Sequence, residues 1–142
     1  MIRGVAEYEK LAHEVRASTS QLKRDGFGRK RYFRVLLAER GKKAVGFALY
    51  FFSYSTFLAK PTLYLEDLYV RPAARGTGAG KALLRALARE ALKEGCGRMD
   101  WQVLADNAPA IEFYERLGAK LHPQWVPTRL SGDPLQRLAD GK

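Results

Sequence analysis

The stretch from residue 62 to 95 constrains the fold most, because a strand pattern passes through a glycine-rich loop into a long amphipathic helix. The strand is "TLYLEDLYV" (62–70), which is rich in aromatic and β-branched residues, and Pro72 ends it. The loop lies in "RGTGAGKALL" (75–84). The helix is predicted to bury one stripe and to end at Gly95 and Gly97; the stripe consists of Leu83, Leu84, Leu87, Ala88, Ala91 and Leu92.

Other segments predict further helices and strands. Apolar residues recur at helical spacing in "VAEYEKLAHEV" (5–15), and Ser18 or Thr19 can cap a second helix that ends at Gly26. The segments "YFRVLLAE" (32–39) and "AVGFALYFF" (44–52) predict two strands joined by a turn. Taken with the central strand, these elements predict an α+β or mixed α/β sheet.

The C-terminal part continues the same pattern. A fourth strand is predicted in "RMDWQVL" (98–104), and a helix in "NAPAIEFYERLGA" (107–119), with Pro109 in its first turn and Gly118 at its end. The tail predicts a final strand in "WVPTRLSG" (125–132) and a short terminal turn in "PLQRLA" (134–139). We expect residues 1–142 to form a single domain.

Composition restricts the class of protein. An apolar share of 46% and an aromatic share of 11% are typical of a globular chain. The most apolar run, 44–59, is shorter than the roughly 20 residues of a membrane span, so no membrane segment is expected. Cys96 is the single cysteine, which excludes an internal disulfide and is compatible with the cytoplasm. The net charge of +10 suits a nucleic acid, an anionic membrane surface or a polyphosphate cofactor.

The glycine-rich loop matches neither of the two common nucleotide motifs. A Walker loop needs a glycine five residues before Gly80 and a hydroxyl after Lys81, whereas this chain has Arg75 and Ala82 there. The dinucleotide pattern Gly-x-Gly-x-x-Gly also fails. What remains is Arg-x-x-Gly-x-Gly before a helix, where free N–H groups and close backbone approach favour a pyrophosphate. A plain glycine-rich turn is the alternative.

Two motifs together resemble one superfamily. The loop motif within "YLEDLYVRPAARGTGAGKALL" and the pattern Asn-x5-Phe-Tyr-x3-Gly within "LADNAPAIEFYERLGA" are similar to the GNAT superfamily of N-acetyltransferases. More narrowly, "VGFALYFFSYSTF", "LYLEDLYV" and "FYERLGA" resemble the diamine acetyltransferase branch, which includes spermidine/spermine and thialysine N-acetyltransferases. The resemblance implies a mostly antiparallel sheet, splayed between two central strands and flanked by helices.

The resemblance also implies a cofactor, acetyl-CoA. The backbone of the loop would hold its pyrophosphate, and the end of the preceding strand would bind its pantetheine arm, with the N–H of Val70 polarising the thioester carbonyl. The helix from Asn107 would line the same cofactor, although Asn107 could equally be only a helix cap. The implied cofactor-binding residues are Leu68, Tyr69, Val70, Arg75, Gly76, Thr77, Gly78, Ala79, Gly80, Lys81, Asn107, Ala110 and Tyr114.

The implied reaction is direct attack of a small-molecule amine on the thioester. Tyr114 matches the acid that protonates the leaving thiolate, with a core aromatic as its alternative reading. Glu66 matches the base, and whether Glu66 or Asp67 faces the cleft stays open. Tyr54 and Phe57 could hold a cationic acceptor on their ring faces, alongside Glu66 and Asp67. No metal site is expected, because neither histidine has ligands at suitable spacing.

Two departures from the superfamily pattern matter. The chain begins inside the expected first helix, so the usual first strand is expected to be missing. Ser55 stands where spermidine/spermine enzymes carry an aspartate, which weakens a polyamine acceptor and favours a thialysine-like one. A cytoplasmic homodimer is expected. The alternatives are a protein lysine or N-terminal acetyltransferase and, from another class, a nucleic-acid-binding module that uses the basic segment 23–34.

Overall fold

The computed structural model describes residues 1–141, which form two units, Met1–Leu104 and the residues from Ala105 onward. In chain order the elements are α1 (Ile2–Tyr8), a 3₁₀ turn (Ala12–Glu14), α2 (Thr19–Phe27), β1 (Arg34–Arg40), β2 (Lys43–Ser55), β3 (Lys60–Val70), a second 3₁₀ turn (Pro72–Ala74), α3 (Ala79–Lys93), β4 (Arg98–Trp101), α4 (Ala108–Glu115) and α5 (Gly132–Ala139). Within the described residues, no helix is long and apolar enough to cross a bilayer.

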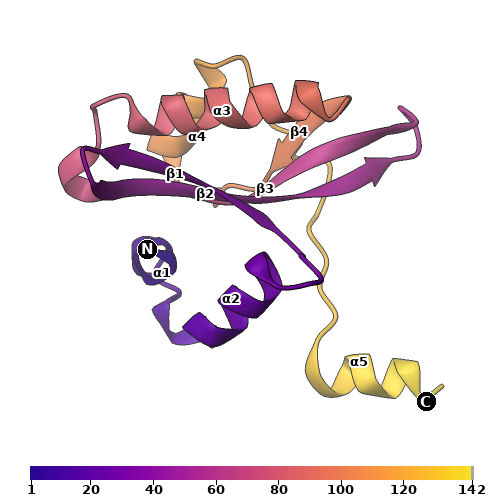
Figure 1. The fold of residues 1–142 in the computed structure, drawn as a ribbon. Coiled ribbons are helices and arrows are strands. Elements are labelled where there is room, and N and C mark those ends of the chain that lie inside the picture. The colour runs from indigo at the N-terminus through magenta and orange to yellow at the C-terminus, as the bar shows by residue number, and fades with distance from the viewer. Residues whose placement is uncertain (142) are drawn as a thin grey trace. The chain divides into compact units, whose positions relative to one another are not determined.

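The first unit is built on a four-stranded sheet in the order β1-β2-β3-β4 (Figure 1). The pairs β1–β2 and β2–β3 are antiparallel, and β3–β4 is parallel. The four strands predicted before residue 105 are confirmed, with ends that differ by a few residues. The fourth stops at Trp101 instead of Leu104, because β4 pairs with β3 only as far as Leu65 and has no neighbour beyond it.

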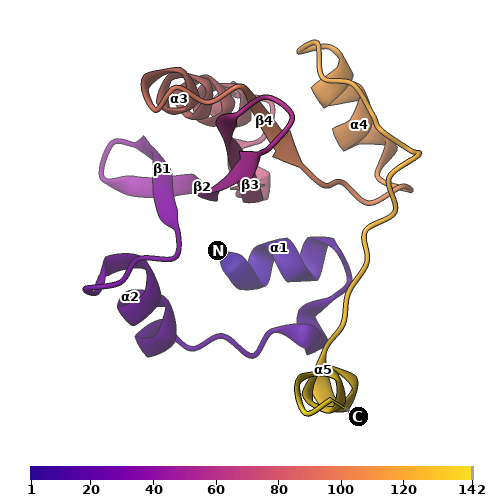
Figure 2. The ribbon, with the colours of Figure 1, turned by 90° about the vertical axis from the view of Figure 1, so that its right-hand side faces the viewer.

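Helix α3 covers one face of the sheet, and α1 and α2 lie on the other (Figures 1 and 2). On α3, Leu83, Leu84, Leu87 and Ala91 are buried, as the apolar stripe predicts. Ala88 and Leu92 were predicted on the same stripe but are exposed. At about 100° per residue, the four buried residues span an arc of about 100° around the helix, and Ala88 and Leu92 lie beyond its edge.

The N-terminal helix is shorter than the predicted 5–15. It ends at Tyr8 in a Schellman motif, in which Lys10 is left-handed at φ 61° and the N–H of Leu11 donates to the carbonyl of Ala6 at 2.7 Å. Leu11 and Val15 remain half-buried after the helix has ended. The apolar spacing therefore predicts correctly which residues are buried, but it does not predict where the helix ends. The second helix is confirmed, with Ser18 as its N-cap in a capping box.

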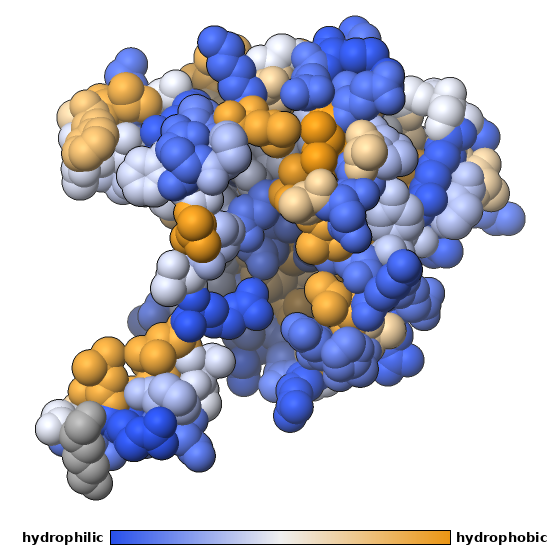
Figure 3. Space-filling model, turned by 180° about the vertical axis from the view of Figure 1, so that it is seen from behind, coloured by the Kyte–Doolittle hydropathy of each residue, from blue (hydrophilic) through white to orange (hydrophobic). Residues whose placement is uncertain are grey.

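The C-terminal tail, in the second unit, differs from expectation. Residues 125–131 form no strand, and residues 132–139 form helix α5 instead of a turn. A lone extended segment has no ladder to join, and Pro127 within it lacks an N–H donor. Apolar side chains gather along α5 in Figure 3, where Leu135 and Leu138 are exposed.

The packing of α3 predicts a contrast between two leucines on the same helix. Leu87 is fully buried (0% exposed), whereas Leu92 is 78% exposed. Leu87→Ala should lower the free energy of unfolding by about 2–5 kcal/mol, because it removes a core side chain and leaves a cavity. Leu92→Ala, the matched control, should change it by less than about 0.5 kcal/mol. Urea unfolding measures both, and equal losses would show that α3 packs in another orientation.

Candidate functional site

A β-bulge in β3 organises the acidic residues of the first unit. Leu49 of β2 pairs with Asp67 and the next residue, Tyr50, pairs with Leu65, so Glu66 is the extra residue on β3. Side chains normally alternate between the two faces of a strand. One inserted residue shifts that alternation by one position, so residues before and after the bulge follow opposite phases.

Contacts on both sides of the bulge show which face each side chain takes. A Cβ on Gly46 would lie 3.3 Å from Val70 and 3.4 Å from Leu83, so these groups face α3. On the opposite face, a Cβ on Gly4 of α1 would meet the Tyr69 hydroxyl at 2.5 Å. Asp67, two residues before Tyr69, shares that face.

Burial, followed by the negative charge of Glu66, raises the pKa of Tyr64, so Glu66 lies close to this β3 residue, whose ring is 5.1 Å from that of Phe51. In the register, the pair Tyr64–Phe51 is next to the pair Leu65–Tyr50. The side chains of Leu65 and Tyr50 point to α3. Tyr64 therefore faces away from α3. The bulge thus brings two consecutive carboxylates, Glu66 and Asp67, to the face that carries α1.

Asp67 is the most perturbed carboxyl of this group. Burial, followed by the negative charges of Glu66 and of Glu9 on the segment after α1, raises the pKa of Asp67 to about 6. Glu66 is exposed, whereas Asp67 is half-buried. Glu9, Glu66 and Asp67, here called the acidic cluster, form a concentration of negative charge in a chain of net charge +10. Such a cluster suits a cationic ligand, while the described residues contain no group arranged to hold a metal ion.

The outer edge of β3 beyond the bulge is open. Because β4 pairs with β3 only from Thr62 to Leu65, no β4 residue lies in register with Leu68 to Val70. The N–H of Arg71 donates to the Val45 carbonyl at 2.8 Å, so Arg71 faces β2. By antiparallel alternation the main-chain groups of Val70 point away from β2. The pairing of β3 with β4 therefore ends at Leu65, and the N–H of Val70 faces an edge of β3 that has no partner strand among the described residues.

The loop after β3 has the shape expected of a phosphate site. Gly76 and Gly78 have φ values of 73° and 87°, and nothing lies within 4 Å of a Cβ built on either. Gly78 is the N-cap of α3 and provides no side-chain cap. Among residues 1–141, no backbone oxygen accepts a hydrogen bond from the N–H of Gly76, Thr77 or Gly78. These donors, with the free N–H groups of the first turn of α3, fit a pyrophosphate.

The predicted aromatic residues are not part of the acidic cluster. Tyr54 and Phe57 lie at the β2–β3 turn and are 65% and 96% exposed. Tyr54 is five residues along β2 from Leu49, the partner of Asp67, which is about 16 Å of extended strand. Ser55 is buried, and its Oγ accepts a hydrogen bond from the N–H of Leu58 at 3.3 Å, so it shapes the turn.

Three other predicted site residues, Asn107, Ala110 and Tyr114, lie in the second unit. Asn107 is the N-cap of α4, and its side chain accepts from the N–H of Ala110 at 3.3 Å. The ring of Tyr114 lies 5.4 Å from that of Phe113. The helix ends in a Schellman motif with Gly118 at φ 91°, as the glycine predicts.

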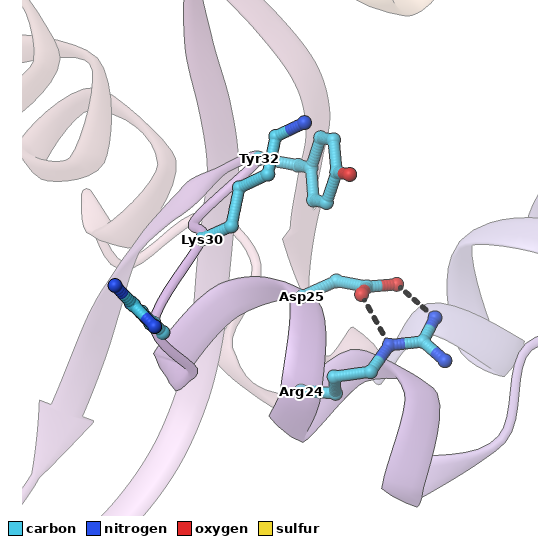
Figure 4. A pocket seen from close by; sticks show the side chains of 5 residues that line it. Arg24, Asp25, Lys30 and Tyr32 are labelled. Carbon is cyan, nitrogen blue, oxygen red and sulfur yellow. Dashed lines mark hydrogen bonds and ion pairs between the residues drawn. The ribbon is translucent and has the colours of Figure 1, made fainter.

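The basic segment 23–34 borders a hollow of about 560 Å³ (Figure 4), lined by Arg24, Asp25, Arg29, Lys30 and Tyr32. Arg24 is neutralised there, because its Nε and Nη2 donate to the two carboxylate oxygens of Asp25 at 2.7 and 3.0 Å. That pairing lowers the pKa of Asp25. Lys30 lies 4.9 Å from the centre of the Tyr32 ring. Part of the positive charge of the segment is therefore used within the segment itself.

The raised pKa of Asp67 predicts a pH-dependent stability. A pKa of about 6 in the folded state exceeds that of an unfolded aspartate, about 3.9, so folding favours the protonated form. Asp67 should therefore oppose folding increasingly as pH rises from about 4 to about 6. Asp67→Asn should raise the urea midpoint at pH 7.5 and leave it unchanged below about pH 4.

Asp25→Asn is the matched control, because the pKa of Asp25 is shifted in the opposite direction. It should lower the midpoint at pH 7.5, since the ionised form of Asp25 stabilises the fold above its unfolded pKa and that contribution disappears as pH falls. A midpoint for Asp67→Asn that is below wild type at pH 7.5 would contradict the assigned burial.

Residues 4–119 match the family model described as "Acetyltransferase (GNAT) family". The chain is 39% identical over 150 residues to thialysine N-epsilon-acetyltransferase of Mus musculus, covering 98% of this chain and 88% of that protein. It is 46% identical over 93 residues to L-ornithine N5-acetyltransferase of Arabidopsis thaliana, covering 66% and 41% of the two chains.

A solved structure also matches the fold. An integron cassette protein from the mobile metagenome of V. cholerae superposes with a TM-score of 0.80 at 30% identity, covering 97% of this chain and 86% of that one. The family match spans most of the chain and includes β3, the glycine-rich loop and α4. The chain therefore belongs to the GNAT family of acetyltransferases, whose acetyl donor is acetyl-CoA.

Proposed function

We propose that the protein acetylates a primary amine of a small molecule, either an amino acid with a side-chain amine, of the lysine or thialysine type, or a diamine or polyamine. The observation that carries the proposal is the acidic cluster beside the open edge of β3. The names of the two relatives, a thialysine and an ornithine acetyltransferase, point to the same class of acceptor. The buried Ser55 provides no carboxylate for a distant ammonium group, which favours the amino acids.

The chemistry explains why an amine acceptor needs carboxylates. An amine of lysine type has a pKa of about 10.4, so roughly 1 in 2,500 molecules is neutral at pH 7. Only the neutral amine attacks a thioester, and this protonation adds about 4–5 kcal/mol to the barrier. A carboxylate close to the amine first attracts the cation and then accepts its proton.

Within the proposal, Glu66 accepts that proton, directly or through water, because it is the exposed member of the pair at the bulge. Asp67 lies behind it and holds the ammonium group by charge. Its pKa of about 6 leaves it ionised at neutral pH, as cation binding requires. Tyr114 supplies the proton for the leaving thiolate.

The chain's own groups would hold acetyl-CoA along β3 and the loop. Acetyl-CoA supplies an activated acyl group as a thioester. The outward N–H of Val70 would bond the thioester carbonyl, and Leu68 and Tyr69 would flank the arm of the cofactor along the strand edge. The amides from Gly76 to Lys81, with Arg75, would bind the pyrophosphate. Asn107 and Ala110 at the start of α4 complete the proposed binding residues.

The loop assignment predicts that an acidic side chain at Gly78 prevents cofactor binding. Gly78→Asp adds a negative charge and a Cβ at φ 87°, where the phosphate would lie, so CoA affinity should fall at least 100-fold, by about 3 kcal/mol or more. Gly41→Asp is the control, because Gly41 also has a positive φ, 61°, and open space, but lies in the β1–β2 turn. Isothermal titration calorimetry with CoA measures both. Equal affinities would remove the phosphate from this loop.

The proposed acid and base predict separable kinetic effects. Tyr114→Phe and Glu66→Gln should each lower kcat by roughly 10²-fold or more, with acetyl-CoA affinity retained. Asp67→Asn should mainly raise KM for the amine, because it removes charge that binds the cation. Steady-state assays of thiol release across pH 6–10 give these values. Wild-type turnover by either of the first two variants would remove that residue from its role.

The acceptor is identified by a panel of amines. Purified protein with acetyl-CoA should release thiol with thialysine, lysine or ornithine faster than with putrescine, spermidine or spermine. Peptides with a free lysine or N-terminus complete the panel, and preference for a peptide would overturn the small-molecule proposal. We also propose a cytoplasmic homodimer, which cell fractionation and light scattering of the purified chain would check.

A further inference from the structure

Arg75, at the start of the glycine-rich loop, is held at two points of its side chain. Its Nε donates a hydrogen bond to the Val70 carbonyl at 3.1 Å. Its guanidinium carbon lies 4.9 Å from the centre of the Tyr8 ring. An arginine side chain has many rotamers when free, so two separate contacts restrict where the guanidinium can lie. The planar group is fixed at the entrance to the loop.

Tyr8 occupies the last position of α1, so the ring is attached to an element that is itself anchored. The helix packs its Gly4 against Tyr69 of β3, where even a Cβ would come within 2.5 Å of the tyrosine hydroxyl. The Schellman motif then ends the helix directly after Tyr8. Glu9, the next residue, belongs to the acidic cluster. One short segment thus contacts both the amine side and the phosphate side of the first unit.

We propose that Tyr8 is a positioning residue: its ring holds the Arg75 guanidinium in the orientation that meets an anionic phosphate at the loop. The inference rests on the proposed binding of acetyl-CoA by this loop. Tyr8 acts through Arg75 and contacts no reacting atom. Its loss should therefore weaken cofactor binding and leave the chemical step unchanged.

The expected loss of CoA affinity follows from how the Tyr8 ring restrains Arg75. Without the ring, Arg75 keeps its charge and its bond to Val70, so attraction to phosphate is reduced and not abolished. Fixing a free arginine side chain on binding costs conformational entropy, which typically reduces affinity by about 3- to 10-fold. In kinetics this appears as a raised KM for acetyl-CoA with kcat unchanged, the pattern of lost uniform binding.

The experiment compares three variants by calorimetric titration with CoA in the absence of amine. Tyr8→Leu should bind CoA about 3- to 10-fold more weakly than wild type. Tyr8→Phe keeps the ring and removes the hydroxyl, so it should remain within about twofold of wild type. Tyr32→Leu is the matched control: Tyr32 also has a cation 4.9 Å from its ring and is 59% exposed, against 49% for Tyr8. It should bind CoA like wild type.

A second measurement judges Tyr8 without any ligand. The NMR order parameter of the Arg75 Nε–H bond should be lower in Tyr8→Leu than in wild type or Tyr32→Leu, because the side chain of Arg75 is less restrained. An unchanged order parameter and unchanged CoA affinity in Tyr8→Leu would overturn the positioning role. If wild type itself fails to bind CoA, the proposed cofactor site is overturned, and the order parameter alone decides the role of Tyr8.

Discussion

The inserted residue at Glu66 is the constraint on which the proposed chemistry depends. In a regular strand, Glu66 and Asp67 would point to opposite faces, and one carboxylate would enter the apolar layer beneath α3. The bulge avoids this cost by changing the phase of β3, so that apolar residues face α3 on both sides of it. The same irregularity gathers negative charge opposite α3. One local change in the backbone therefore satisfies both the packing against α3 and the negative charge that the proposed function needs.

The second determinant is the junction of β3 with α3. The strand ends at Val70 with main-chain groups turned toward an unpaired edge, and the helix begins at Ala79 without a side-chain cap. Unpaired donors at a helix N-terminus are costly unless water or an anion satisfies them. The core beneath, with Leu83 and Leu87 against the sheet, fixes the direction in which these donors point. The proposed anion site therefore follows from the way α3 is attached to β3.

Sequence patterns predicted much of this arrangement, for identifiable reasons. The strands and the glycine-rich loop could be predicted because strand propensity, glycine positions and helical stripes are local signals. The bulge was not predicted: in "LEDLYV" two consecutive carboxylates interrupt the alternation of apolar residues, but only the register against β2 identifies Glu66 as the extra residue. Tyr8 was assigned to an apolar stripe, and no local signal pointed to its contact with Arg75. The tail was predicted as a strand because its composition is strand-like, although a strand also needs a neighbour.

The two faces of the sheet separate two kinds of evolutionary constraint. Residues that face α3 form the core, and the core fixes the direction of the N–H groups at the loop. Substitutions of these core residues therefore affect both folding and the binding of acetyl-CoA. On the α1 face, Phe47, Leu49 and Thr62 are buried, whereas Glu66 is exposed and Asp67 is half-buried. New side chains at exposed positions of α1 or α2 can therefore alter the surroundings of the acidic cluster without repacking the interior. Such a division allows a lineage to change its acceptor while it keeps a common acyl donor.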